Sequence, residues 1–310
     1  MNSMWRALRL ALFLAAGLSA GVAALASARG AEAPTCRDLE RRFDPPKVTA
    51  TQLDLALFAA ADAGCVPLSR RLLDTGASLE ARDRLGAMAL ARAARAGHVA
   101  LVDLFLAQGA AIDARNLAGS TALYSASENE RQATVALLLA KGADPNLPGR
   151  SGVTPLAAAA FKGNDRIVAA LIDRGADPNV SDSTGKAAIT YAAARGFATI
   201  VRRLLDAGVD ARRTWGNDLT ALMWAAGHED GVGTSAALDV IAMLLDAGAP
   251  IDAVDDRGRT ALMTAAELGH AAIVELLLAR GADRTIADKR GQRAIDLAAD
   301  EGVRAKLAAR

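Results

Sequence analysis

The sequence is poor in aromatic residues. Only 4% of its 310 residues are Phe, Trp or Tyr, although 52% are hydrophobic, so that alanine and leucine supply much of the apolar mass. Such a composition suits a β-sandwich or a barrel poorly, whereas many short helices can pack closely through small residues. The shortage of aromatic residues therefore favours an all-α fold.

Side chains and motifs that carry out chemistry are also scarce. The chain has two cysteines and three histidines, and it contains no HExxH zinc motif, GxxxxGK[S/T] phosphate loop or GxSxG nucleophile turn. Its net charge is only +1, which gives no sign of a broad basic surface for nucleic acid. We therefore expect a protein that is not an enzyme, that uses no cofactor or metal ion and that does not bind nucleic acid.

Long hydrophobic runs are absent except near the N-terminus, where Arg6 and Arg9 precede an apolar run over residues 10–25 and small residues at 26–28. This is the pattern of a secretory signal peptide. We predict a signal peptide over residues 1–28 and a lead-in over residues 29–50. Cleavage would leave a periplasmic or secreted protein, whereas an uncleaved leader would anchor the protein in the inner membrane, facing the periplasm.

Both cysteines, Cys36 and Cys65, lie after the predicted cleavage site. Export to an oxidising compartment makes a disulfide between them possible. The alternative is two unpaired thiols, because sequence spacing alone does not establish the geometry of a bridge.

Two sets of glycines recur at the same fixed interval along the chain. This interval equals the sequence separation between Gly86 and Gly119. One set lies in turns, at Gly86, Gly119, Gly152, Gly185, Gly258 and Gly291. In the unit between Gly185 and Gly258, Asp218 takes the place of the glycine. The other follows each unit at Gly76, Gly109, Gly142, Gly175, Gly208, Gly248 and Gly281. Both sets share a single longer interval, in the sixth unit. Self-similarity at a fixed period of this length indicates a stacked repeat protein.

Each unit predicts a pair of helices. A threonine begins the first helix in several units, and its hydroxyl can accept a backbone N–H there: Thr121, Thr154, Thr220 and Thr260. Alanine pairs follow, and a second helix shows apolar residues at helical spacing, as at Ile273, Val274 and Leu277. A Gly-Ala pair and a polar turn then complete the unit.

The segments GVTPLAAAAFKGNDRIVAALIDRGADPN and DDRGRTALMTAAELGHAAIVELLLARGAD resemble ankyrin repeats. The resemblance extends over about residues 51–310. It implies an ankyrin-repeat solenoid of about seven helix pairs, with a shortened C-terminal capping repeat and projecting hairpin-like fingers. It also implies structural roles for His98 and His270 at the turns between helices, and a binding role for the protein. One departure is that residues such as Tyr124 and Ala157 replace the family's usual histidine near the start of the first helix.

The concave face that the resemblance implies is where a partner would bind. Aromatic residues concentrate in repeats four to six, and two polar residues share their helix stripes, which gives the candidates Phe161, Tyr191, Arg195, Trp215, Trp224 and His228. Aromatic residues and arginine are typical interface anchors. The alternative is that the rings fill gaps between helices. For Phe161 and Trp215 we favour binding, because rings in a turn or at an outer helix position have less core to fill.

Basic residues in the last two fingers offer a second candidate surface, formed by Arg257, Arg259, Lys289, Arg290 and Arg293. This edge could face an acidic partner. The alternative is the polar outer face of a capping repeat.

Repeat six is longer than its neighbours, and alignment places the extra residues in the turn between its two helices, within residues 227–236. The triplet His228-Glu229-Asp230 could ligate a metal on paper, but the repeat register places no second histidine or cysteine nearby. We expect instead a solvated acidic loop or a contact loop at the rim of the concave face.

Together these patterns predict an exported bacterial protein, expected to be a monomer, that binds a partner protein by its concave face. Two roles follow. The protein would support an envelope enzyme, as some exported ankyrin proteins are associated with catalase, or it would act as an immunity protein against a toxic effector.

Overall fold

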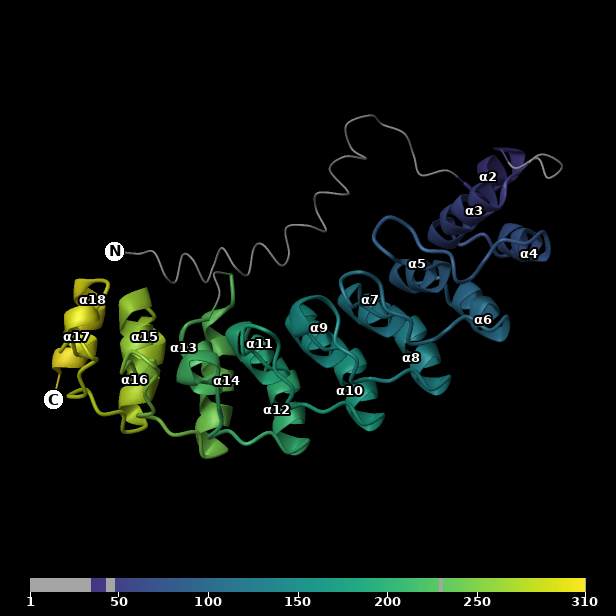
Figure 1. The fold of residues 1–310 in the computed structure, drawn as a ribbon. Coiled ribbons are helices and arrows are strands. Elements are labelled where there is room, and N and C mark those ends of the chain that lie inside the picture. The colour runs from purple at the N-terminus through teal and green to yellow at the C-terminus, as the bar shows by residue number, and fades with distance from the viewer. Residues whose placement is uncertain (1–34, 43–47, 229–230, 310) are drawn as a thin grey trace.

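The computed structural model describes residues 35–42, 48–228 and 231–309. The predicted signal peptide, part of the predicted lead-in and the pair Glu229-Asp230 lie outside these residues. Within them, short helices stack side by side into a curved solenoid, with the first helix of each repeat on the concave side and the second on the convex side (Figure 1). This confirms the predicted all-α ankyrin-type fold.

Seven helix pairs are followed by a shorter eighth pair. In chain order they are α3 (Ala50–Ala63) and α4 (Val66–Asp74), α5 (Ala89–Ala96) and α6 (Val99–Ala107), α7 (Ala122–Glu128) and α8 (Gln132–Ala140), α9 (Pro155–Lys162) and α10 (Asp165–Asp173), α11 (Ala188–Ala194) and α12 (Ala198–Asp206), α13 (Ala221–Ala226) and α14 (Thr234–Asp246), α15 (Ala261–Leu268) and α16 (Ala271–Ala279), and α17 (Ala294–Leu297) and α18 (Glu301–Ala308).

The first helices begin where the sequence predicts. The hydroxyl oxygens of Thr121, Thr154, Thr220 and Thr260 each accept a backbone N–H from the residue three positions on, at 3.1–3.2 Å. Each bond satisfies one of the donors that a helix N-terminus leaves without a partner. Pro155 stands at the first position of α9, where its missing N–H costs nothing.

Each finger is a tight hairpin between successive repeats. In most fingers a backbone N–H donates to the carbonyl four positions on, as from Asp182 to Lys186 at 2.8 Å. The finger that precedes repeat six forms two short paired strands, β1 (Thr214–Trp215) and β2 (Leu219–Thr220). Neighbouring fingers bond to one another, as from Ser183 N–H to the Ser151 carbonyl at 2.8 Å. The fingers therefore form one continuous edge of the concave face.

Alanine pairs on the first helices form the centre of the stack. Ala93, Ala159, Ala193, Ala225 and Ala265 are all fully buried, so that neighbouring helices pack through methyl groups. The second helices add larger aliphatic side chains, as predicted from their spacing. The core is therefore a thin continuous layer that runs the length of the solenoid.

In three repeats, the residue just before the second helix bonds to the previous repeat. The His98 imidazole donates to the Asp62 carbonyl at 2.9 Å, and the His270 imidazole donates to the Ala226 carbonyl at 2.9 Å. Arg131 makes the equivalent bond to the Arg95 carbonyl at 3.0 Å. The two histidines thus have the inter-repeat structural role that the family resemblance implies.

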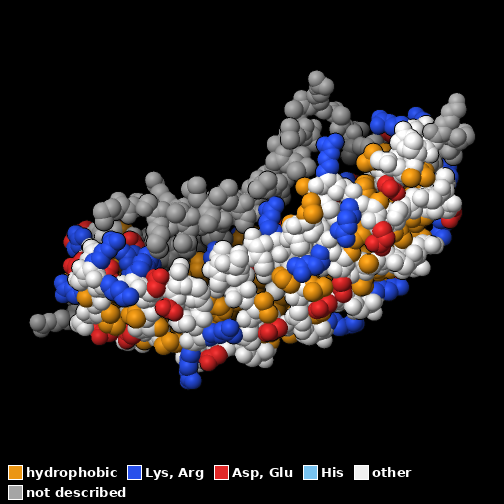
Figure 2. All heavy atoms as spheres, viewed as in Figure 1, with side chains coloured by type: hydrophobic (Ala, Val, Ile, Leu, Met, Phe, Trp, Pro, Cys, Tyr) orange, Lys and Arg blue, Asp and Glu red, His pale blue; other side chains and the backbone are white. Residues whose placement is uncertain are grey.

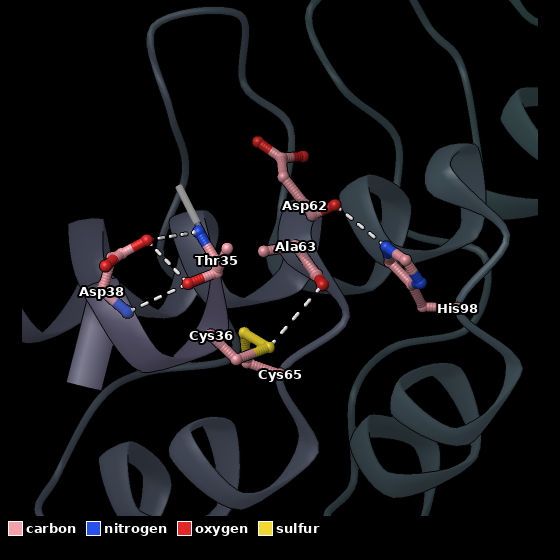
Figure 3. The surroundings of a disulfide bond; sticks show 7 residues. All are labelled: Thr35, Cys36, Asp38, Asp62, Ala63, Cys65 and His98. Carbon is pink, nitrogen blue, oxygen red and sulfur yellow. Dashed lines mark hydrogen bonds between the residues drawn. A yellow bond between two sulfur atoms is a disulfide. The ribbon is translucent and has the colours of Figure 1, made fainter. Parts of the chain in front are cut away.

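The N-terminal end of the stack is closed by a helix that the sequence did not predict, α2 (Cys36–Arg42). A disulfide joins Cys36 to Cys65, the residue before α4, with the two Cα atoms 5.4 Å apart (Figure 3). Of the two alternatives for the cysteines, the structure has the bridge. It fastens part of the predicted lead-in to the first repeat.

The insertion in repeat six is divided between the turn and the second helix, so the prediction that it is confined to the turn is wrong. Helix α14 has 13 residues, whereas α16 has nine. A methyl group added at Gly196 would come within 2.7 Å of a Val232 side-chain carbon and 3.1 Å of the Ala236 Cβ. The insertion therefore packs back against repeat five.

In the described part of the chain, every helix is too short or too polar to cross a membrane.

Candidate functional site

Four candidate residues and two others form a network of rings and cations across repeats four to six. Phe161 lies near the end of α9, Tyr191 and Trp224 lie on α11 and α13, and Arg195 directly follows α11. Phe161, Tyr191, Arg195 and Trp224 therefore lie on or next to the first helices, which form the concave side of the solenoid (Figure 1). The sequence analysis did not single out its remaining two members, Lys186 and Phe197.

The Arg195 guanidinium lies over two phenylalanine rings. Its central carbon is 4.6 Å from the Phe161 centroid and 5.6 Å from the Phe197 centroid. Phe197 precedes α12, and its ring lies against Gly163, where an added methyl group would come within 2.6 Å of it. The arginine is therefore held by rings from two successive repeats, and cation–π attraction favours that position.

Lys186 connects Tyr191 to Trp224. Its ammonium nitrogen is 5.8 Å from the Tyr191 centroid and 5.3 Å from the Trp224 centroid. The lysine comes from the fifth finger, just before α11, so that the finger edge and the helix surface meet here. Tyr191 also meets Phe161 edge-to-face, with centroids 5.7 Å apart and planes at 82°. These contacts join the network into one surface.

The Tyr191 hydroxyl anchors the network to the finger. It donates to the Asp182 carboxylate, which also accepts backbone N–H groups from Thr184 at 2.8 Å and Lys186 at 3.1 Å. Burial, and then the Asp182 carboxylate, raise the pKa of Tyr191 far above its ordinary value. The phenol therefore stays neutral and remains a hydrogen-bond donor at physiological pH.

The two tryptophans are too deeply buried to be typical of an exposed binding surface. Trp215 and Trp224 are each 6% exposed, whereas Phe161, Tyr191 and Arg195 are half-buried. Trp215 lies in β1, with the Arg213 guanidinium 5.8 Å from its centroid, and is separate from the network. The expectation that Trp215 has little core to fill is therefore wrong, because the finger folds its ring inward.

His228 has a histidine neighbour that the repeat register did not reveal. Its ring stacks on His270 with centroids 4.0 Å apart and planes 1° apart. The prediction that no second histidine lies nearby is therefore wrong. The reason is that α13 ends at Ala226, so that His228 lies in the turn and reaches the start of α16 in the next repeat.

The basic residues of the last fingers are largely compensated within the chain. Arg257 pairs with Asp255 at 2.7 Å, and Arg259, which is 8% exposed, contacts Glu267 and lies 3.5 Å from Asp288. Figure 2 shows the same mixture more widely, with acidic and basic side chains interspersed over the face in view. The placement of Arg257 and Arg259 favours a capping face over a docking edge.

Among the described residues, no group of three or more His, Cys, Asp or Glu side chains is arranged to hold a metal ion. Of the candidate triplet His228-Glu229-Asp230, the structure describes only His228.

Comparison with known families places these features in context. Sequence models of ankyrin repeats match residues 57–149, 90–182, 156–234, 217–256 and 244–298. The chain belongs to the ankyrin-repeat family. A comparison with curated proteins found no match.

Ankyrin repeats are protein–protein interaction modules, and the matches extend across the repeats that carry the network. The sequence located most of the network because its rings recur in adjacent repeats. It missed Lys186 and Phe197, although their signal was present. Lys186 follows the turn glycine Gly185, and Phe197 occupies the slot that holds His98 and His270 in other repeats.

Proposed function

We propose that this ankyrin-repeat protein binds a partner protein through the concave face of repeats four to six, after export to the periplasm. The partner would be an envelope enzyme that the protein supports or a toxic effector that it blocks. The observation that carries the proposal is the part of this network formed by the half-buried side chains of Phe161, Tyr191, Lys186 and Arg195, on or beside the first helices. Interface anchors are characteristically aromatic and arginine side chains gathered in one place.

Replacing Phe161 by alanine is expected to weaken partner binding by about 2 kcal/mol, the cost of removing an interface anchor. The ring contacts Tyr191 and Arg195, so that its loss also releases the guanidinium that it holds. Partners would be crosslinked in the native cell envelope, identified by mass spectrometry and then titrated against the purified variants.

A matched control is Leu205→Ala, which truncates a half-buried apolar side chain on α12, on the convex side. This control should bind as the parent protein does. If Phe161→Ala binds normally but melts early, the ring has only a packing role and the proposed site is wrong.

Export is expected to produce a mature protein that begins after residue 28, because signal peptidase cleaves behind small residues. The Cys36–Cys65 disulfide supports this proposal, since structural disulfides persist chiefly in oxidising compartments. The intact mass of the protein from its native envelope tests it. A mass that still includes the predicted signal peptide would instead support the anchored alternative.

A further inference from the structure

Two exposed leucines lie side by side on adjacent fingers near the N-terminal end of the solenoid. Leu85, in the finger that precedes repeat two, is 67% exposed, and Leu117, in the finger that precedes repeat three, is 81% exposed. The Leu117 N–H donates to the Leu85 carbonyl at 3.0 Å, and a methyl group added at Gly86 would come within 2.8 Å of the Leu117 Cγ. The packing of the two fingers therefore holds an apolar pair out in solvent.

The fingers around this leucine pair carry a net positive charge. The three fingers that precede repeats two, three and four contain four arginines and one aspartate, namely Arg82, Arg84, Arg115 and Arg150 against Asp83. The equivalent positions of the four later fingers contain five basic and five acidic residues, over residues 181–186, 214–219, 254–259 and 287–292. Asp83 is already paired with Arg92 at 2.5 Å. The excess of positive charge is therefore confined to the fingers that carry or adjoin the leucines.

All four arginines are exposed, and none forms an ion pair within the described part of the chain. Arg82 and Arg115 instead bridge neighbouring fingers, because Arg82 donates to the Arg115 carbonyl at 2.7 Å and Arg115 donates to the Pro148 carbonyl at 3.1 Å. A carbonyl is neutral, and a guanidinium keeps its proton in proteins, so these bonds order the side chains without cancelling their charge. Arg84 and Arg150 add two further positive charges beside this ordered row.

We propose that this edge, formed by Leu85, Leu117 and the four arginines, docks on an anionic lipid bilayer. The leucines enter the boundary between headgroups and acyl chains, while the guanidinium groups stay at the level of the phosphates, as long basic side chains do at membrane interfaces. The charge of the edge is complementary to an anionic lipid surface, which attracts basic residues close to it. Such docking requires no spanning helix.

The leucines favour a bilayer over other acidic partners. Nucleic acid offers phosphates to the arginines but no apolar medium for side chains that project from hairpins. A protein would need a pocket shaped to the two leucines, whereas acyl chains adapt to their shape. The proposal goes beyond the proposed function, because the ring network lies in repeats four to six and stays open to a partner.

The test measures flotation of the mature protein, from residue 29 onward, with vesicles of equimolar phosphatidylcholine and phosphatidylglycerol. This form keeps every described element. It should float with these vesicles and not with phosphatidylcholine alone, and salt should weaken binding because exposed charges are screened. Leu85→Ser with Leu117→Ser should weaken binding about tenfold, since less apolar area is buried. Arg84→Gln with Arg150→Gln should also weaken it about tenfold, because each basic residue adds attraction to the surface.

Each pair of substitutions has a matched control. Val254→Ser alters an exposed apolar residue in the finger that precedes repeat seven, where Asp255 and Asp256 follow it. Arg166→Gln with Arg202→Gln removes two exposed charges from α10 and α12 on the convex side. Both controls should bind the vesicles as the parent does. Thermal melts followed by circular dichroism verify that all variants are folded.

The proposal is overturned if the parent protein does not float with anionic vesicles, if it floats equally well with neutral ones, or if the controls lose as much binding as the variants. Binding that depends on the arginines but not on the leucines would point to a polyanion rather than to lipid. Capture of an envelope protein by a photoreactive group at position 117, without vesicle binding, would make the edge a protein-docking surface.

The proposed function is tested independently of this edge. Phe161→Ala should leave vesicle binding unchanged, and the double substitution of Leu85 and Leu117 should leave capture of the concave-face partner unchanged. Either proposal can therefore fail while the other stands.

Discussion

Replacing Trp215 by alanine is expected to destabilise the protein by about 3–5 kcal/mol, the usual range for truncating a large buried aromatic ring. The indole is 6% exposed, and Leu219, opposite it in the β1–β2 pair, is buried as well. Its Nε1 has no hydrogen-bond partner within the described part of the chain, so the loss is one of packing rather than of a hydrogen bond.

Chemical denaturation followed by circular dichroism measures this loss. Leu117→Ala is the matched control, because Leu117 is also a finger residue but is 81% exposed. It should change stability by no more than about 0.5 kcal/mol, as is typical of surface substitutions. The Trp215 variant that remains folded should still bind the partner, since the ring lies outside the network. Normal stability combined with lost binding would instead restore Trp215 as an interface anchor.

Removing the disulfide, by Cys36→Ser with Cys65→Ser, is expected to lower the stability of the N-terminal cap by about 3.5 kcal/mol. The cysteines are 29 residues apart, and a bridge over that separation restricts the unfolded chain by about this amount. Helix α2 has no fully buried residue, so little else holds it in place. Hydrogen exchange should show α2, α3 and α4 losing protection while α9 to α16 keep theirs, because repeats contact only their neighbours.

Reduction provides an internal control for this second prediction. A reducing agent should lower the protection of the parent cap to that of the double variant, and it should leave the double variant unchanged. A uniform loss of protection along the whole solenoid would show that the cap is coupled to every repeat and would contradict the nearest-neighbour explanation.

The architecture was predictable because the same local sequence signals recur in most repeats. The threonine caps, the alanine pairs and the glycines that follow each second helix recur at one period, and the structure uses them as expected. A signal repeated this often identifies a fold even where single positions depart from it. The replacement of the family's usual histidine by Tyr124 is one such departure.

The site was predictable only in part, because its contacts cross repeat boundaries. The register located Tyr191 and Trp224 in adjacent repeats, but the side chain that joins them, Lys186, comes from a finger. The stacking of His228 on His270 depends on where α13 ends, and periodicity does not determine that. The inward position of the Trp215 ring likewise depends on the local hairpin.

The position of the disulfide has a consequence for the order in which the molecule can assemble. Cys36 and Cys65 both precede every repeat but the first, so that they emerge early from a ribosome or a translocation channel. In the proposed export to an oxidising compartment, the bridge can close while most repeats are still in transit, and the closed cap then offers a folded end onto which each later repeat can dock. The bridge in this way favours growth of the solenoid from a single end.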